Sequence, residues 1–162
     1  MASNNQIRRQ LVHLLTDSQA HMTFAQAVAA YPPAAINTAF PNAPYTPRHL
    51  LEHLRLAQRD ILDFVADPPY REGTWPDDYW PARDARATAA DWRRTIAAFR
   101  RDLQALVDRV SDPQTDLDAL IARGNGQTIF REIVLVADHN AYHIGEFAIM
   151  RQVMGTWADA PH

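Results

Sequence analysis

The chain has 162 residues, a net charge of −3, a hydrophobic fraction of 47% and no cysteine. This length predicts one domain over residues 1–162, and the negative charge argues against a nucleic-acid partner, which would need a basic surface. The lack of cysteine excludes disulfides, thiolate ligands and a cysteine nucleophile, so histidine and carboxylate side chains would have to hold any metal.

Two helical segments are expected in the first third of the chain. The first is predicted over residues 4–17, with Ser3 or Asn4 as N-cap. Its apolar residues recur at helical spacing, and they are Ile7, Leu11, Leu14 and Leu15. A short helical piece follows Thr23 and is expected to stop at Pro32-Pro33, because proline disfavours helix in the residue before it.

Two long helices follow. The second helix is expected from the N-cap Thr46, with Pro47 in its first turn, to about Ala66. Its apolar stripe consists of Leu50, Leu54, Ala57, Ile61 and Val65. The third helix is expected from about Thr88 to Val110. Its inward residues are Trp92, Ile96, Phe99, Leu103, Leu106 and Val110.

The fourth long helix is expected from the cap Thr128 to Gly155 and is apolar almost all round, which is typical of a helix buried among others. No strand alternation occurs, so we predict an all-α, four-helix bundle. The joint at about residues 67–87 is long. It can span ~65 Å when extended, enough to cross the whole bundle and start the third helix parallel to the second.

His139 and His143 lie four residues apart in the fourth helix, so both side chains face the same way and could bind one metal ion. Glu132, Glu146 and Met150 share their stripe. Buried polar groups need partners, which a metal, ordered water or hydrogen bonds would supply. The alternative for the two glutamates is an interhelical salt bridge.

A third ligand would come from another helix, and the candidates are His13, His21, His49 and His53. His53 lies about 13 residues from the end of the second helix, and the pair lies about as far from the start of the fourth. If these two helices run antiparallel, the three histidines are level, which favours His53. His49 is rotated further toward solvent, and we expect it on the surface rather than as a fourth ligand.

The segments "TPRHLLEHLRLAQRDILDF" and "LVADHNAYHIGEF" resemble the DinB/YfiT-like family of metalloenzymes, over about residues 5–155. The resemblance implies a four-helix bundle with a three-histidine metal site. It implies His53, His139 and His143 as the ligands. It also implies activation of a low-molecular-weight thiol cosubstrate for S-transfer to a small electrophile. Where the family often has glutamine, this chain has Glu146.

Three neutral ligands leave an open metal position, which is typical of a catalytic site, and both zinc and nickel suit imidazole. The hypotheses are a thiol transferase, a metal-dependent hydrolase, and a non-catalytic bundle that binds a metal or a small ligand. For acid–base chemistry we name Glu146 first and Asp60 second. Trp75 and Trp80 either form an aromatic lid that binds an apolar substrate or anchor the joint on the bundle.

The expected partners and location follow from the same sequence. We expect a small-molecule substrate and a possible homodimer. No signal peptide and no apolar run of membrane-spanning length is recognisable, which predicts a cytoplasmic protein without a membrane partner.

Overall fold

The computed structural model describes residues 2–66 and 69–157, and over these residues the protein is all-α, as predicted. A short 3-10 helix spans Pro33–Ala35, and the described part contains no strand. The α-helices are α1 (Ala2–Thr16), α2 (Phe24–Val28), α3 (Pro47–Val65), α4 (Ala89–Ser111) and α5 (Ile129–Val153).

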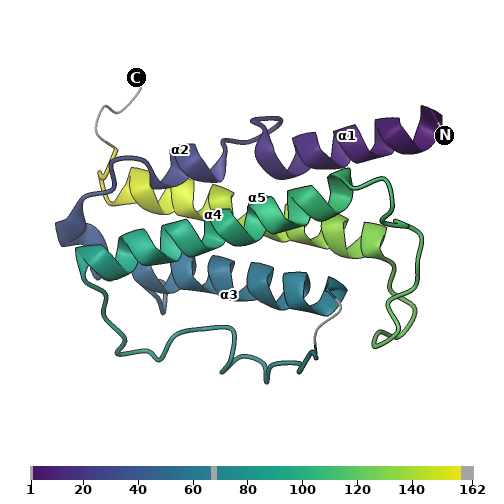
Figure 1. The fold of residues 1–162 in the computed structure, drawn as a ribbon. Coiled ribbons are helices and arrows are strands. Elements are labelled where there is room, and N and C mark those ends of the chain that lie inside the picture. Colours follow the sequence, from purple (N-terminus) through teal and green to yellow (C-terminus); the bar gives the residue numbers. More distant parts are fainter. Residues whose placement is uncertain (1, 67–68, 158–162) are drawn as a thin grey trace.

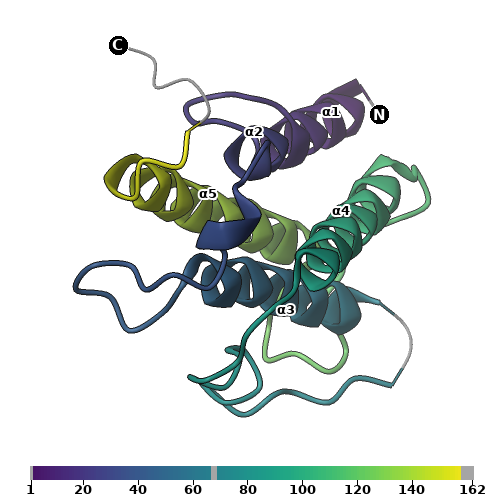
Figure 2. The ribbon, with the colours of Figure 1, turned by 90° about the vertical axis from the view of Figure 1, so that its left-hand side faces the viewer.

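Four of these helices, α1, α3, α4 and α5, lie lengthwise beside one another (Figures 1 and 2). Residues 69–88 run back along the length of α3, so α4 starts at the same end as α3 and runs in the same direction (Figure 1). The helix α5 returns in the opposite direction and packs against α3. The long crossover therefore makes α3 and α5 antiparallel neighbours.

Threonine caps explain where α4 and α5 start. The predicted start of the first helix and the predicted end of the short second one are wrong. The hydroxyls of Thr88 and Thr128 each accept a hydrogen bond of 3.2 Å from a backbone N–H three residues on. The helix α1 already includes residues 3 and 4, so neither residue caps it. The helix α2 ends at Val28 rather than at the prolines, because Ala29 is extended and Ala30 has a φ of 47°.

The apolar core has two clusters. One surrounds Phe99 and Phe147 at the end of the bundle where α3 begins, and the other surrounds Leu106 and Ile133 at the opposite end. Two residues predicted for the apolar stripe of α1 contribute little, since Ile7 and Leu14 are 38% and 42% exposed. In the described residues, no helix is both long and apolar enough to cross a membrane.

The fully buried Arg151 ties the end of α5 to the end of α2. Its guanidinium donates hydrogen bonds of 2.7 Å to three backbone carbonyls, those of Ala27, Ala29 and Thr156. It also lies 3.9 Å from the ring centroid of Trp157, a cation–π contact. One buried side chain therefore satisfies carbonyls at the end of α2, just after α2 and just after α5.

Candidate metal centre

Three histidines from two helices converge at one point between α3 and α5. The Nε2 atom of His53 lies 3.2 Å from Nε2 of His143 and 3.3 Å from Nε2 of His139. One nitrogen from each ring lies within 4.8 Å of the others, and His53 and His143 are buried. The antiparallel arrangement brings His53 level with the pair on α5, as the sequence predicted.

The outer nitrogens of two rings fix which inner nitrogens carry no proton. His53 Nδ1 donates to the backbone carbonyl of Tyr79 at 2.8 Å, and His143 Nδ1 donates to Glu146 Oε2 at 2.7 Å. Because each neutral imidazole has a single N–H, both Nε2 atoms then present bare lone pairs. Two lone pairs that face each other across 3.2 Å repel, and a cation between them removes this repulsion.

The spacing and the donor chemistry both fit a metal ion. Two ligands about 2.05 Å from a tetrahedral zinc are ~3.3 Å apart, which matches the two Nε2 separations. Three neutral imidazoles suit zinc and nickel alike. The residues present therefore fit a divalent metal held by His53, His139 and His143.

Burial favours the uncharged form of two of the three imidazoles, those of His53 and His139. It lowers the pKa of His53 and lowers that of His139 to about 4, and the neighbouring imidazoles add to the effect at both rings. At neutral pH the metal would not have to displace protons from these two side chains.

The metal-free protein is expected to lose stability as the pH falls from 7 to 5. His139 has a pKa of about 4 when folded and 6.5 normally, so in this range the unfolded chain binds more protons. His139 alone would lower the free energy of unfolding by about 1–2 kcal/mol. Urea titrations of chelated protein at both pH values measure this, and the dependence should shrink in His139→Gln. An unchanged dependence in that variant would contradict the assignment.

Glu146 contacts His143 at Nδ1, the ring nitrogen that does not face His53. Its Oε2 accepts from His143 Nδ1, and its Oε1 accepts from the hydroxyl of Tyr45. Burial alone would raise the pKa of Glu146, but these hydrogen bonds bring it below its ordinary value, so the group is a carboxylate at neutral pH. Its direct contact with the cluster is therefore through His143.

Removing this carboxylate is expected to weaken metal binding. Glu146→Leu leaves His143 Nδ1 without its acceptor, and losing such a partner typically costs 10- to 100-fold in metal affinity. Glu146→Gln retains an amide oxygen that can accept the same bond, so its loss should be clearly smaller. Competition titration with a chromogenic chelator compares the two variants, and equal affinities in both would show that the hydrogen bond does not position His143.

The crossover brings aromatic side chains to the cluster. The ring of Trp80 stacks on His53 with centroids 4.0 Å apart and planes inclined by 6°. Trp75 approaches the same imidazole edge-on at 6.2 Å and is 67% exposed. The exposed Tyr142 lies beside His143, with the two ring centroids 4.9 Å apart. Both predicted substrate-binding tryptophans thus lie beside His53.

Asp60 lies apart from the histidines. It lines a separate hollow of about 370 Å³ together with Glu132, Tyr70 of the crossover and the loop before α5, and none of the three histidines lines this hollow. Tyr70 donates a hydrogen bond of 2.9 Å to Asp60, and burial raises the pKa of this carboxyl. Glu132, on the same helical stripe as the ligands, is paired with its neighbour Arg131 at 2.6 Å.

The prediction for His49 is wrong, because this side chain is buried, with 5% of its surface exposed. Its Nδ1 accepts from the backbone N–H of Thr46 at 3.3 Å, and its Nε2 donates to the carbonyl of Ala82 at 3.0 Å. The crossover covers the side of α3 that a helical wheel assigns to water. His49 therefore fastens the crossover to the start of α3, and both of its nitrogens are engaged.

The protein belongs to the class of α-helical bundles in which three histidines converge. Two of these histidines lie on one helix, and the third lies on its antiparallel neighbour. A family model described as the DinB superfamily matches residues 16–147, and the chain belongs to this superfamily. Neither a curated protein nor a solved structure gives a significant match.

Proposed function

We propose that this protein is a metal-dependent enzyme that transfers a low-molecular-weight thiol to a small electrophile. The observation that carries the proposal is the convergence of three imidazoles, two of them fixed with their lone pairs inward. A divalent metal bound there supplies a Lewis-acid centre that lowers the pKa of a coordinating thiol. Because the chain has no cysteine, the thiol is a cosubstrate.

The surrounding residues hold the ligands and receive the apolar reactant. The Tyr79 carbonyl and Glu146 orient the imidazoles, and Trp75 and Trp80 offer aromatic faces beside His53. In the transfer, the thiol sulfur forms a bond to the electrophilic carbon. The bond to the leaving group breaks, the leaving group takes the electron pair, and the thiol proton passes to water.

The test combines metal analysis with a substrate screen. Protein loaded with zinc or nickel is assayed with aryl halides and epoxides, with and without cysteine or glutathione. We expect turnover that requires both thiol and metal and that stops on chelation or in His139→Ala. Thiol-independent turnover would instead support hydrolysis, and a bound metal without any turnover would support a non-catalytic binding protein.

Trp75→Ala is expected to raise KM for an apolar electrophile several-fold while kcat and metal affinity stay unchanged. The ring is largely exposed, so truncating it costs little packing, and the melting temperature should barely move. Steady-state kinetics and thermal melting measure the two effects. A fall in melting temperature with KM unchanged would show that Trp75 anchors the crossover rather than contacting the substrate.

A further inference from the structure

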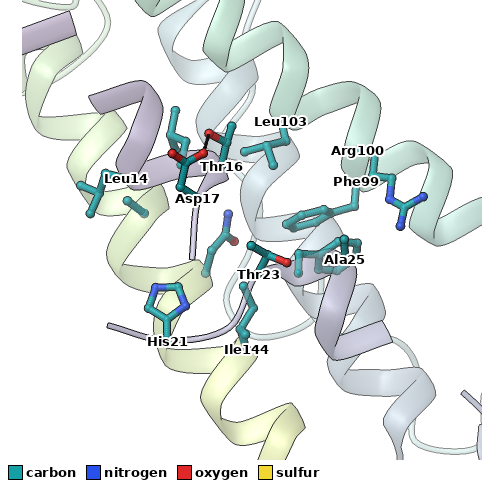
Figure 3. Close-up of a pocket in the computed structure, with 14 residues that line it drawn as sticks. Leu14, Thr16, Asp17, His21, Thr23, Ala25, Phe99, Arg100, Leu103 and Ile144 are labelled. Carbon is teal, nitrogen blue, oxygen red and sulfur yellow. Dashed lines mark hydrogen bonds between the residues drawn. The ribbon is translucent and has the colours of Figure 1, made fainter. Parts of the chain in front are cut away.

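The hollow that Asp60 lines carries charges of both signs. It lies where the end of α3, the start of the crossover and the loop before α5 meet at one end of the bundle (Figure 1). Its charged residues are Asp60, Glu72, Arg123, Arg131 and Glu132. By contrast, the pocket shown in Figure 3, between the joint of α1 and α2, α4 and α5, is lined mainly by apolar side chains. The hollow at Asp60 can therefore select a ligand by its charges, over a volume of about 370 Å³.

Asp60 and two aromatic rings form a part of the hollow that suits a cation. Asp60 accepts a hydrogen bond of 2.9 Å from the hydroxyl of Tyr70, and the ring of Tyr70 packs against Phe64 with centroids 5.2 Å apart. Burial raises the pKa of Asp60, and the negative charges of Glu72 and Asp63 add to this effect. An ammonium group beside Asp60 would offset both effects, and aromatic faces also attract such a group.

Arg123 and Arg131 bring positive charge to the same hollow. The guanidinium carbon of Arg123 lies 5.9 Å from the ring centroid of Tyr70. Arg131 Nη1 donates to the buried Glu132 at 2.6 Å, and the side chain of Arg131 is 55% exposed. This bond occupies one of the five N–H groups of the guanidinium, so a carboxylate that enters the hollow can bind others.

The hollow lies two helical turns from the histidine cluster along both α3 and α5. Asp60 follows His53 by seven residues, and Glu132 precedes His139 by seven. Because the two helices are antiparallel, both steps lead in the same direction, and seven residues rise by ~10 Å. Tyr79 contacts both places, since its carbonyl binds His53 and its hydroxyl bonds Asp60. One extended molecule of this length could therefore reach both.

We propose that this hollow binds the zwitterionic amino-acid end of a peptide thiol, an inference that rests on the thiol transfer proposed above. The ammonium group lies beside Asp60, and the carboxylate lies beside Arg131. The sulfur then reaches the histidine cluster, because two residues of an extended peptide span ~7 Å and the thiol side chain adds the rest. Glutathione, with a free amino acid at its γ-glutamyl end, has this form.

Ophthalmic acid, the analogue of glutathione in which a methyl group replaces the thiol, tests the hollow without the sulfur. Calorimetry on the chelated full chain should show binding that is at least ~10-fold weaker after acetylation of the amino group, the effect of one charge-assisted hydrogen bond. Asp60→Asn keeps an amide oxygen for Tyr70 and should remove the difference between the free and the acetylated probe. Asp108→Asn, exposed on α4 outside the hollow, should leave the difference unchanged.

Kinetics then separate this inference from the transfer reaction itself. Metal-loaded protein should use glutathione with a KM at least ~10-fold lower than that for 2-mercaptoethanol, which has no amino-acid end, and Asp60→Asn should raise the KM for glutathione. Equal KM values for the two thiols, equal binding of the free and the acetylated probe, or no binding of ophthalmic acid would each overturn the inference while the transfer reaction stands. Amine-dependent binding without turnover of any thiol would support the binding site and reject the transfer reaction.

Discussion

Replacing His53 with alanine is expected to abolish stoichiometric binding of zinc or nickel. His53 is the candidate ligand on α3, and its Nε2 lies within 3.3 Å of the Nε2 atoms of both candidate ligands on α5. Two imidazoles on one helix remain, so the site loses a third of its donors and its attachment to the second helix. We expect the dissociation constant to rise by more than the ~10- to 100-fold that the loss of a supporting hydrogen bond costs, measured by competition with a chromogenic chelator.

His13→Ala is the matched control, because His13 is exposed on α1 and pairs with Asp17. It removes one imidazole from the chain but should leave metal affinity unchanged. Full metal content in His53→Ala, or an equal loss in both variants, would refute the assignment of the ligands. Circular dichroism of both variants ensures that the comparison is made between folded proteins.

Arg151→Ala is expected to lower the free energy of unfolding by about 3–5 kcal/mol, the range found when one member of a buried polar network is removed. Three backbone carbonyls lose their donor, and the space beside Trp157 is left unfilled. Urea denaturation monitored by helical ellipticity measures the change. The melting temperature should fall by about 10 °C, at ~2–4 °C per kcal/mol for a chain of this size.

The control for this variant is Arg94→Ala. Arg94 is exposed on α4 and pairs with Asp91 on the same helix, and such pairs contribute less than about 1 kcal/mol. If the two arginine variants had the same stability, Arg151 would not hold α2 on the end of α5.

Much of the site could be predicted from spacing alone. The i, i+4 pair on α5 requires only helical periodicity, and the level of His53 follows from a rise of ~1.5 Å per residue once α3 and α5 are antiparallel. The same helical wheel misplaced His49, because a wheel describes an isolated helix and the crossover covers that side of α3. The wheel also made Ile7 and Leu14 core residues, whereas α1 buries mainly Leu11 and the guanidinium of Arg8.

The groups that orient the ligands could not be predicted. One of them is the backbone carbonyl of Tyr79, and every residue has a carbonyl, so no side-chain pattern marks it. Another is Tyr45, whose partner Glu146 is 101 residues away along the chain. Only the tertiary structure brings these groups together. Asp60, named second for acid–base chemistry from the sequence, lines a hollow that none of the three histidines lines.

The ligands are also far apart in sequence, since 90 residues separate His53 from His143. A metal ion held by both closes a loop that contains the crossover, all of α4 and more than half of α5. It therefore acts as a reversible cross-link: closing a loop of this size can stabilise a fold by up to ~4–5 kcal/mol through the lost freedom of the unfolded chain. Metal supply would then help to set how long the protein survives proteolysis.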